Sequence, residues 1–157
     1  MSDVRSGRHV ALHRLAAVLS AVYLVALALI AFWPAPVDQG AHGPLTSILA
    51  SLHRHGGPGW LTYNVVEFTA NIALFVPVGV LSVILLGARH WWFAIVAGLA
   101  ASVLIEFGQL IFLPARFATV NDVIANTFGA ALGAAAALLL LRFVRASPPA
   151  APRAPRV

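Results

Sequence analysis

The sequence predicts an all-α fold, a polytopic membrane bundle of four transmembrane helices with one short interfacial helix. Of its 157 residues, 61% are hydrophobic and only 10% are charged, whereas about a quarter of a soluble domain is charged. Four long apolar runs are separated by short segments rich in Pro, Gly and Arg. We divide the chain into a cytoplasmic N-terminal segment (1–14), one transmembrane domain (15–145) and a disordered, cytoplasmic Pro/Ala tail (146–157).

The first apolar run extends from Leu15 to Trp33. Its length is close to the roughly 20 residues that a helix needs to span hydrocarbon. A signal peptide also follows a basic flank, but its apolar core is only about 7–15 residues long. The longer run favours an uncleaved first span, which ends at the interface with Trp33-Pro34.

The connection over residues 34–63 contains Leu45, Ile48, Leu49 and Leu52 at helical spacing. This pattern predicts a helix over residues 45–55, which is too short to span and is expected to lie on the membrane surface. Gly56-Gly57-Pro58-Gly59 then ends it.

Three further spans follow, over residues 65–86, 91–113 and 120–141. Asn64-x-x-Glu67 and Thr119-x-x-Asp122 resemble capping boxes at the starts of the second and fourth spans. Pro77 lies inside the second span, where neighbouring helices are expected to satisfy the freed carbonyl groups. The turn over residues 87–90 joins the second and third spans.

Arginine placement predicts the sidedness. Four spans leave both termini on one side, which then holds eight of the ten basic residues, all of them arginine. The other side holds only Arg54 and Arg116. The positive-inside rule therefore predicts cytoplasmic termini, in the plasma membrane of a cell.

Polar residues recur in the outer half of three spans. With a rise of about 1.5 Å per residue, Asn71, Glu106 and Asn126 each lie roughly 9–10 Å below the outer end of their span. Glu67 and Asp122 lie one turn higher, and Gln109 is shallower than Glu106. Such residues are costly in a membrane, so we interpret them as a functional site. The predicted ligand-binding residues, which form a polar pocket open to the outside, are Glu67, Asn71, Glu106, Gln109, Arg116, Asp122 and Asn126.

The same residues have plainer explanations. Glu67 and Asp122 suit helix caps, while Asn71, Gln109 and Asn126 suit interhelical hydrogen bonds. Glu106 is not at a helix end, and a buried carboxylate must be paired or protonated. Arg116 is its expected partner, and Asp122 competes for that guanidinium.

Gly129 and Gly133 have the small-xxx-small spacing that lets another helix approach closely. We expect them to serve helix packing below the polar level.

The chain resembles the VanZ-like family of bacterial membrane proteins over about residues 64–140. The resemblance rests on three blocks in order: Glu67-x-x-x-Asn71-Ile72-x-Leu74-Phe75-x-Pro77-x-Gly79, Ser102-x-x-x-Glu106-x-x-Gln109, and Arg116 followed by Asp122-Val123-x-x-Asn126-Thr127-x-Gly129-x-x-x-Gly133. The family is named for a protein that raises resistance to the glycopeptide antibiotic teicoplanin. The resemblance implies a role in the cell envelope. Family members often carry further acids near Arg116, where this chain has Thr119 and Asn121, and this weakens a metal-binding reading.

The sequence excludes several chemistries. Without cysteine there is no disulfide or thiol catalysis. His42, His53 and His55 have no close acid to complete a ligand set, so we expect no metal and no cofactor. The arginines lie mostly in flanks and tails, which does not indicate nucleic-acid binding.

Three functions remain. The favoured one is a non-enzymatic protein whose outer pocket binds an amphipathic envelope ligand, such as a lipid-linked intermediate or a lipid-bearing glycopeptide, beside membrane lipids. The alternative is a membrane-embedded enzyme with Glu106 as acid or base and Arg116 stabilising negative charge. The third is a proton-coupled carrier, for which four spans would require a homo-oligomer.

Overall fold

The computed structural model describes residues 2–33, 39–113 and 119–146. These residues form five α-helices and one short 3₁₀ helix, in the order α1 (Ser2–Ala31), α2 (Gln39–Arg54), α3 (Tyr63–Leu86), η1 (Ala88–His90), α4 (Trp92–Phe112) and α5 (Val120–Ala146). Four stretches within α1, α3, α4 and α5 are long and apolar enough to cross a membrane: His13–Ala31, Tyr63–Leu86, Trp92–Phe112 and Val120–Val144. This confirms the predicted all-α membrane bundle.

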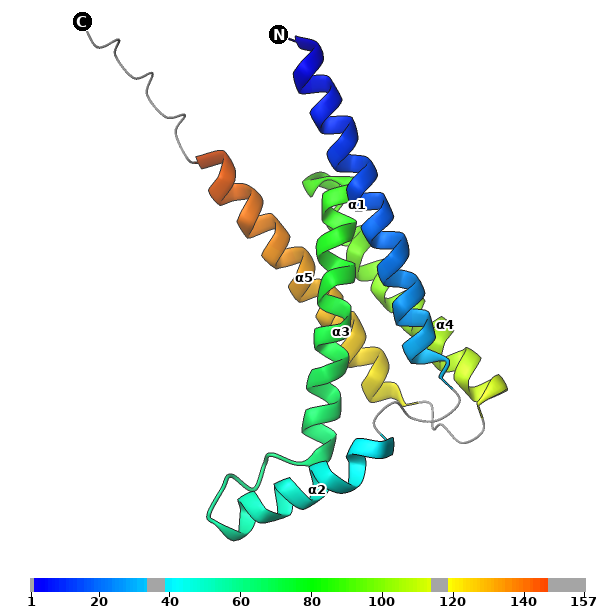
Figure 1. The fold of residues 1–157 in the computed structure, drawn as a ribbon, viewed down its shortest axis with the longest axis vertical. Coiled ribbons are helices and arrows are strands. Elements are labelled where there is room, and N and C mark those ends of the chain that lie inside the picture. The colour runs from blue at the N-terminus through cyan, green and yellow to red at the C-terminus, as the bar shows by residue number, and fades with distance from the viewer. Residues whose placement is uncertain (1, 34–38, 114–118, 147–157) are drawn as a thin grey trace, which may run out of the picture.

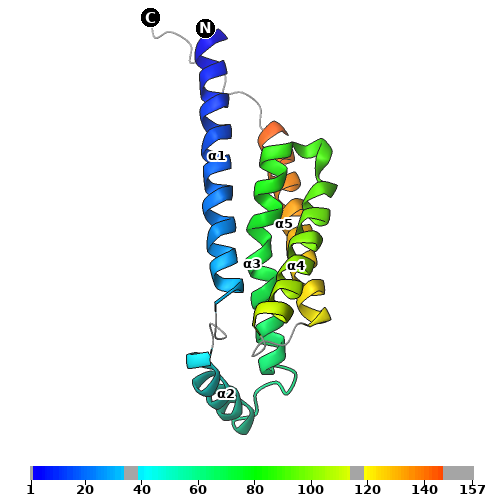
Figure 2. The same ribbon diagram turned by 90° about the vertical axis from the view of Figure 1, so that its right-hand side faces the viewer.

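The four long helices run between the same two ends of the molecule in alternating directions, and α2 lies across one of these ends (Figures 1 and 2). We call this end the α2 end. The start of α1 and the end of α5 both lie at the opposite end, which we call the terminal end (Figure 1). This arrangement brings the start of α1 and the end of α5 to one end of the bundle, as four spans require.

The closest packing joins α3 to α5, and glycine permits it. A Cβ atom added to Gly129 or Gly133 would overlap the carbonyl oxygen of Ile72 or Val76 on α3. From the other side, a Cβ on Gly79 would overlap the Ala130 carbonyl of α5. The two backbones therefore touch directly, which is how helices gain packing energy in lipid.

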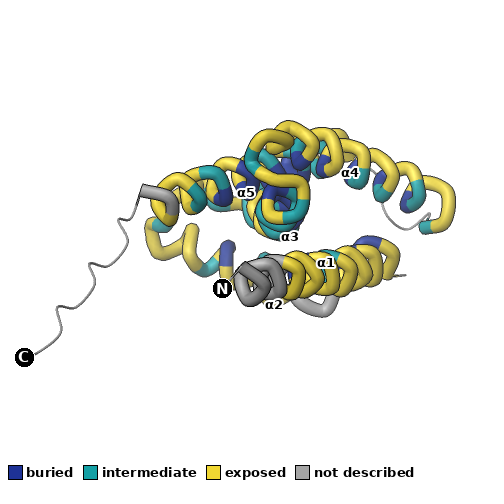
Figure 3. Tube along the Cα trace, turned by 90° about the horizontal axis from the view of Figure 1, so that it is seen from above, coloured by how far each residue is buried: buried dark blue, intermediate teal, exposed yellow. Residues whose placement is uncertain are grey.

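Helix α1 stands beside the α3–α5 pair (Figures 2 and 3), and its Leu27 joins Phe75 and Val78 of α3 in a buried cluster. The Tyr23 hydroxyl donates to the carbonyl of Leu74, at 2.6 Å. Leu74 lies three residues before Pro77, where the proline ring disturbs the helical hydrogen bonds. Near the α2 end, the Phe32 ring lies against Gly108, leaving no room for a Cβ there. A few specific contacts thus attach α1 to the other helices.

Helix α2 begins at Gln39, earlier than the predicted 45–55 segment, and ends at Arg54. Pro44 lies inside α2, five residues after its start and beyond the first turn, so it cannot donate a helical hydrogen bond to the Gly40 carbonyl. Leu49 is buried, whereas Ile48 and Leu52 are exposed. An amphipathic helix lying across the bundle end is consistent with the predicted interfacial helix.

The structure corrects the predicted N-cap of α3 and confirms the predicted N-cap of α5. Thr62, and not Asn64, is the N-cap of α3, because its side chain accepts from the N–H of Val65. The predicted Asn64 cap was therefore placed two residues late. At α5, the Thr119 hydroxyl accepts from the N–H of Asp122 at 3.1 Å, as the cap-like pattern predicts. The residues of the predicted tail after Ala146 lie outside the described residues.

Candidate ligand site at the α2 end

Asn71 and Asp122 form a direct bond between α3 and α5. The Asn71 amide nitrogen donates to Asp122 Oδ1 at 2.5 Å. Both side chains are half-buried. The Asp122 carboxylate lies in the first turn of α5, where the helix dipole favours negative charge. Two predicted site residues are thus brought together.

Asn126 and Ser102 form a second bond, between α5 and α4. The Asn126 amide nitrogen donates to Ser102 Oγ at 2.9 Å. Asn126 is 5% exposed and Ser102 is fully buried. The other end of the Asn126 amide, Oδ1, has no hydrogen-bond partner among the described residues. Because buried polar atoms are nearly always paired, this oxygen is an unused acceptor inside the bundle.

Glu106 joins α4 to the start of α5. Its Oε2 accepts the backbone N–H of Thr119 at 2.8 Å. Only 9% of the residue is exposed. The first N–H groups of a helix have no acceptor within the helix, so a carboxylate at this position stabilises the start of α5. Arg116, its predicted partner, lies outside the described residues.

Gln109 points to α1. Its amide nitrogen donates to the carbonyl of Ala31, the last residue of α1, at 2.8 Å. This carbonyl belongs to the last turn of α1, so the bond caps the end of α1 from α4. Glu67, in contrast, is exposed on the second turn of α3. The structure directs Gln109 to α1, away from the Asn71, Asp122 and Asn126 group. Glu67 lies one turn before Asn71 on the same face of α3.

The depths of the polar side chains along the bundle differ from the sequence prediction in one respect. Asn71, Glu106 and Asn126 were expected at a single depth, with Asp122 one turn above. Instead, Asn71 is level with Asp122, while Asn126 is bonded one turn deeper to Ser102. The reason is that α3 and α5 are offset along their axes, which counting from each helix end cannot show. The polar residues form a graded column about two turns deep.

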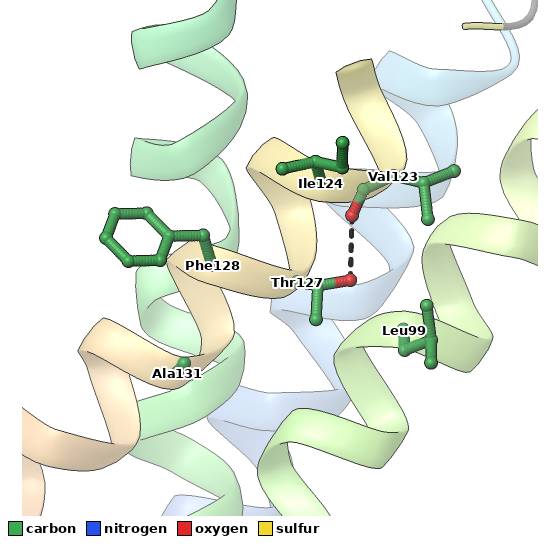
Figure 4. Close-up of a pocket in the computed structure, with 6 residues that line it drawn as sticks. All are labelled: Leu99, Val123, Ile124, Thr127, Phe128 and Ala131. Atoms are coloured by element: carbon green, nitrogen blue, oxygen red, sulfur yellow. Dashed lines mark hydrogen bonds between the residues drawn. The ribbon is translucent and has the colours of Figure 1, made fainter. Parts of the chain in front are cut away.

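An apolar groove lies on the lipid side of the same α4–α5 seam (Figure 4). Its volume is about 370 Å³. The lining consists of Leu99, Val123, Ile124, Thr127, Phe128 and Ala131. The Thr127 hydroxyl is used internally, since it donates to the Val123 carbonyl at 2.7 Å. The groove therefore presents mainly apolar side chains, which suit contact with a hydrocarbon chain.

Sequence reasoning left Ser102, Thr119 and Tyr23 out of its set of site residues. Ser102 had a signal, because it lies one turn before Glu106 on the same helix face. Thr119 contributes its backbone N–H, and because every residue except proline has this group, the residue type gives no signal. Tyr23 donates to a backbone carbonyl near a proline, and only the three-dimensional arrangement shows that pairing. Within the described residues, no group of three His, Asp or Glu side chains is placed to hold a metal ion.

Four membrane-length helices with polar contacts at one end define a polytopic α-helical membrane protein. A family model described as VanZ/LLP1 matches residues 20–142. The chain belongs to this VanZ-like family. No curated protein and no solved structure matched the chain.

Proposed function

We propose that this protein binds an amphipathic ligand of the cell envelope in the outer leaflet of the plasma membrane. The polar column at the α2 end would bind the head group, and the groove between α4 and α5 would hold a hydrocarbon chain. The ligand class is a lipid-linked envelope intermediate or a lipid-bearing glycopeptide. Binding, and not catalysis, is the proposed activity.

The unused Asn126 Oδ1 is the observation that carries the proposal. An amide oxygen buried without a partner costs about 1–3 kcal/mol. A ligand hydroxyl or N–H that reached Asn126 along the seam would remove this cost. Ser102 and Glu106 lie on the same face of α4, so further polar atoms of a head group would find partners next to it.

The groove supports the ligand class. Along α5, Val123 and Thr127 are the neighbours of Asn126 on the side away from α3, so the polar column and the apolar groove are adjacent. The groove residues of α5 run from Val123 to Ala131, about 12 Å along the helix axis. A chain lying there would leave its polar end toward the start of α5. This is the arrangement that an amphipathic molecule needs.

The proposed sidedness rests on charge. Arg14, Arg89 and Arg142 belong to the terminal end and are exposed. Cytoplasmic loops carry the excess of Arg, so the terminal end is proposed to be cytoplasmic and the α2 end to face outward. The outer leaflet is where a lipoglycopeptide arrives and where exported lipid-linked intermediates reside.

The test is direct binding to the full chain in lipid nanodiscs. Fluorescently labelled teicoplanin is one probe, and a polyprenyl-diphosphate disaccharide is the other. At least one should bind saturably. Asn126→Ala should weaken that binding about tenfold, as expected for one buried hydrogen bond. Thr127→Trp should also weaken it by filling the groove.

Asn121→Ala is the matched control, because Asn121 is an exposed asparagine on the same helix. It should bind like wild type. The proposal is wrong if neither probe saturates, or if Asn121→Ala and Asn126→Ala lose affinity equally. Circular dichroism melting of each variant separates lost binding from lost folding.

A further inference from the structure

Two histidines meet the C-terminal end of α3 from different elements. His13 Nε2 of α1 lies 3.1 Å from the Leu85 carbonyl, and His90 Nδ1 of η1 lies 3.0 Å from the Leu86 carbonyl. These carbonyls are among the last four of α3, which have no helical N–H to accept from. With the facing ring nitrogen protonated, each histidine donates to one of them.

This arrangement gathers arginines at the terminal end. Arg14 follows His13 in α1, and Arg89 precedes His90 in η1. Both side chains are exposed. Figures 1 and 2 both show α1 passing the connection between α3 and α4 at this level. Arg14 and Arg89 are therefore each adjacent in sequence to a histidine that contacts the end of α3.

No carboxylate is available to neutralise them from nearby segments. The five acids are Asp3, Asp38, Glu67, Glu106 and Asp122, so residues 4–37, 72–105 and 123–157 contain none. Asp3 precedes Arg14 by more than ten residues, about 16 Å along α1. The end of α3 therefore has two histidine hydrogen-bond donors and two nearby arginines, and no Asp or Glu lies in the adjoining segments to balance their charge.

Aromatic side chains mark the depth of this surface. Trp91, Trp92 and Phe93 are all exposed at the start of α4. Trp92 and Phe93 are stacked, with ring centroids 3.8 Å apart. Tryptophan favours the head-group level of a bilayer. With the tryptophans at that level, Arg14 and Arg89 would be level with the phospholipid phosphates.

We propose that the terminal end binds an anionic phospholipid through Arg14 and Arg89. The guanidinium groups would donate to phosphate oxygens, for which their planar geometry is suited. Trp91 and Trp92 would pack against the glycerol and upper acyl region. The site is distinct from the ligand site, because it lies at the opposite end of the bundle, and it does not depend on that function.

The test is selective retention of lipid by the full chain. Purified protein in a neutral detergent is given phosphatidylglycerol or phosphatidylcholine, and binding is measured by native mass spectrometry and by thermal melting. Phosphatidylglycerol should be retained more strongly and should raise the melting temperature more. Arg14→Gln/Arg89→Gln should weaken its apparent affinity about tenfold or more.

Arg54→Gln is the matched control, since it removes one exposed arginine at the α2 end. It should keep the preference for phosphatidylglycerol. Equal retention of both lipids, or an equal loss in Arg54→Gln, would overturn the proposal. Inorganic phosphate with the same stabilising effect would overturn it as well, by indicating a site for a free anion. If the double variant does not fold, the two single variants carry the test, and each should lose part of the preference.

Discussion

The Asn126 amide nitrogen lies 2.9 Å from Ser102 Oγ, and this bond joins α5 to α4 in the buried part of the bundle. The pair uses one end of the amide and leaves Oδ1 without a partner among the described residues. A polar pair kept in this form is poorly explained by stability alone. Replacing both members of a buried pair by apolar groups is often neutral or favourable.

The first prediction separates stability from function at this pair. Ser102→Ala should lower the free energy of unfolding by about 1 kcal/mol, because it leaves the Asn126 amide nitrogen unpaired as well. Ser102→Ala together with Asn126→Leu should recover that loss, because no polar atom is then stranded. Reversible unfolding in mixed detergent micelles measures both. The recovered double variant should still fail to bind ligand, and a double variant as unstable as the sum of its single changes would contradict the prediction.

Much of the fold could be predicted from the sequence because each span is a long apolar run with its own end signals. Helix lengths, helix caps and charge asymmetry depend on residues close together in the sequence, so the Thr119 cap and the arginine distribution could be interpreted without knowing how the helices pack. The Asn71–Asp122 bond needed the axial offset of α3 and α5, which is set by where glycines let the backbones meet. Gln109 was placed with the ligand residues since its face matched theirs, yet it reaches the end of α1. A stripe on one helix does not say which neighbour it faces.

The second prediction concerns the glycines of the α3–α5 contact. Gly129→Leu and Gly133→Leu should each destabilise the fold strongly, and Gly→Ala should do so as well, because even a Cβ would overlap the α3 backbone. Overpacking of this kind typically costs about 1–3 kcal/mol, and more for a larger group. Ala135→Leu is the control, because Ala135 is exposed on the same helix. Thermal stability in detergent that is unchanged for both glycine variants would show that α3 and α5 do not touch here.

The third prediction concerns sidedness. The chain has no cysteine, so single cysteines can be introduced at Gly40 and Ala150 without a background. With cytoplasmic termini, a membrane-impermeant maleimide should label Gly40→Cys in intact cells and Ala150→Cys only after lysis. Labelling of Ala150→Cys from outside would refute the proposed orientation.

The fourth prediction concerns the attachment of α1. Tyr23→Phe removes the hydroxyl that donates to the Leu74 carbonyl, with almost no change in volume. The expected loss is about 0.6 kcal/mol, the average for an interhelical hydrogen bond in a membrane. Limited proteolysis should then release α1 more readily than in wild type. Release of α1 at the wild-type rate, with unchanged stability, would contradict this prediction.

The last prediction concerns Glu106 and Arg116. Glu106 is buried near the start of α5, where its Oε2 already accepts the Thr119 N–H. Arg116 lies three residues before Thr119 in the sequence, and a long arginine side chain can reach down from the interface. We therefore expect the two to act as one unit. Glu106→Gln and Arg116→Gln should each destabilise the protein more than the double change does, because the surviving charge is left desolvated.

Thr119→Ala is a useful control, since it removes the cap to Asp122 but keeps the N–H that Glu106 uses. Coupling below about 0.5 kcal/mol in the double-mutant cycle would show that Glu106 and Arg116 are independent. Asp122 would then be the better partner for Arg116, and the Thr119 N–H would remain as the established contact of the Glu106 carboxyl group.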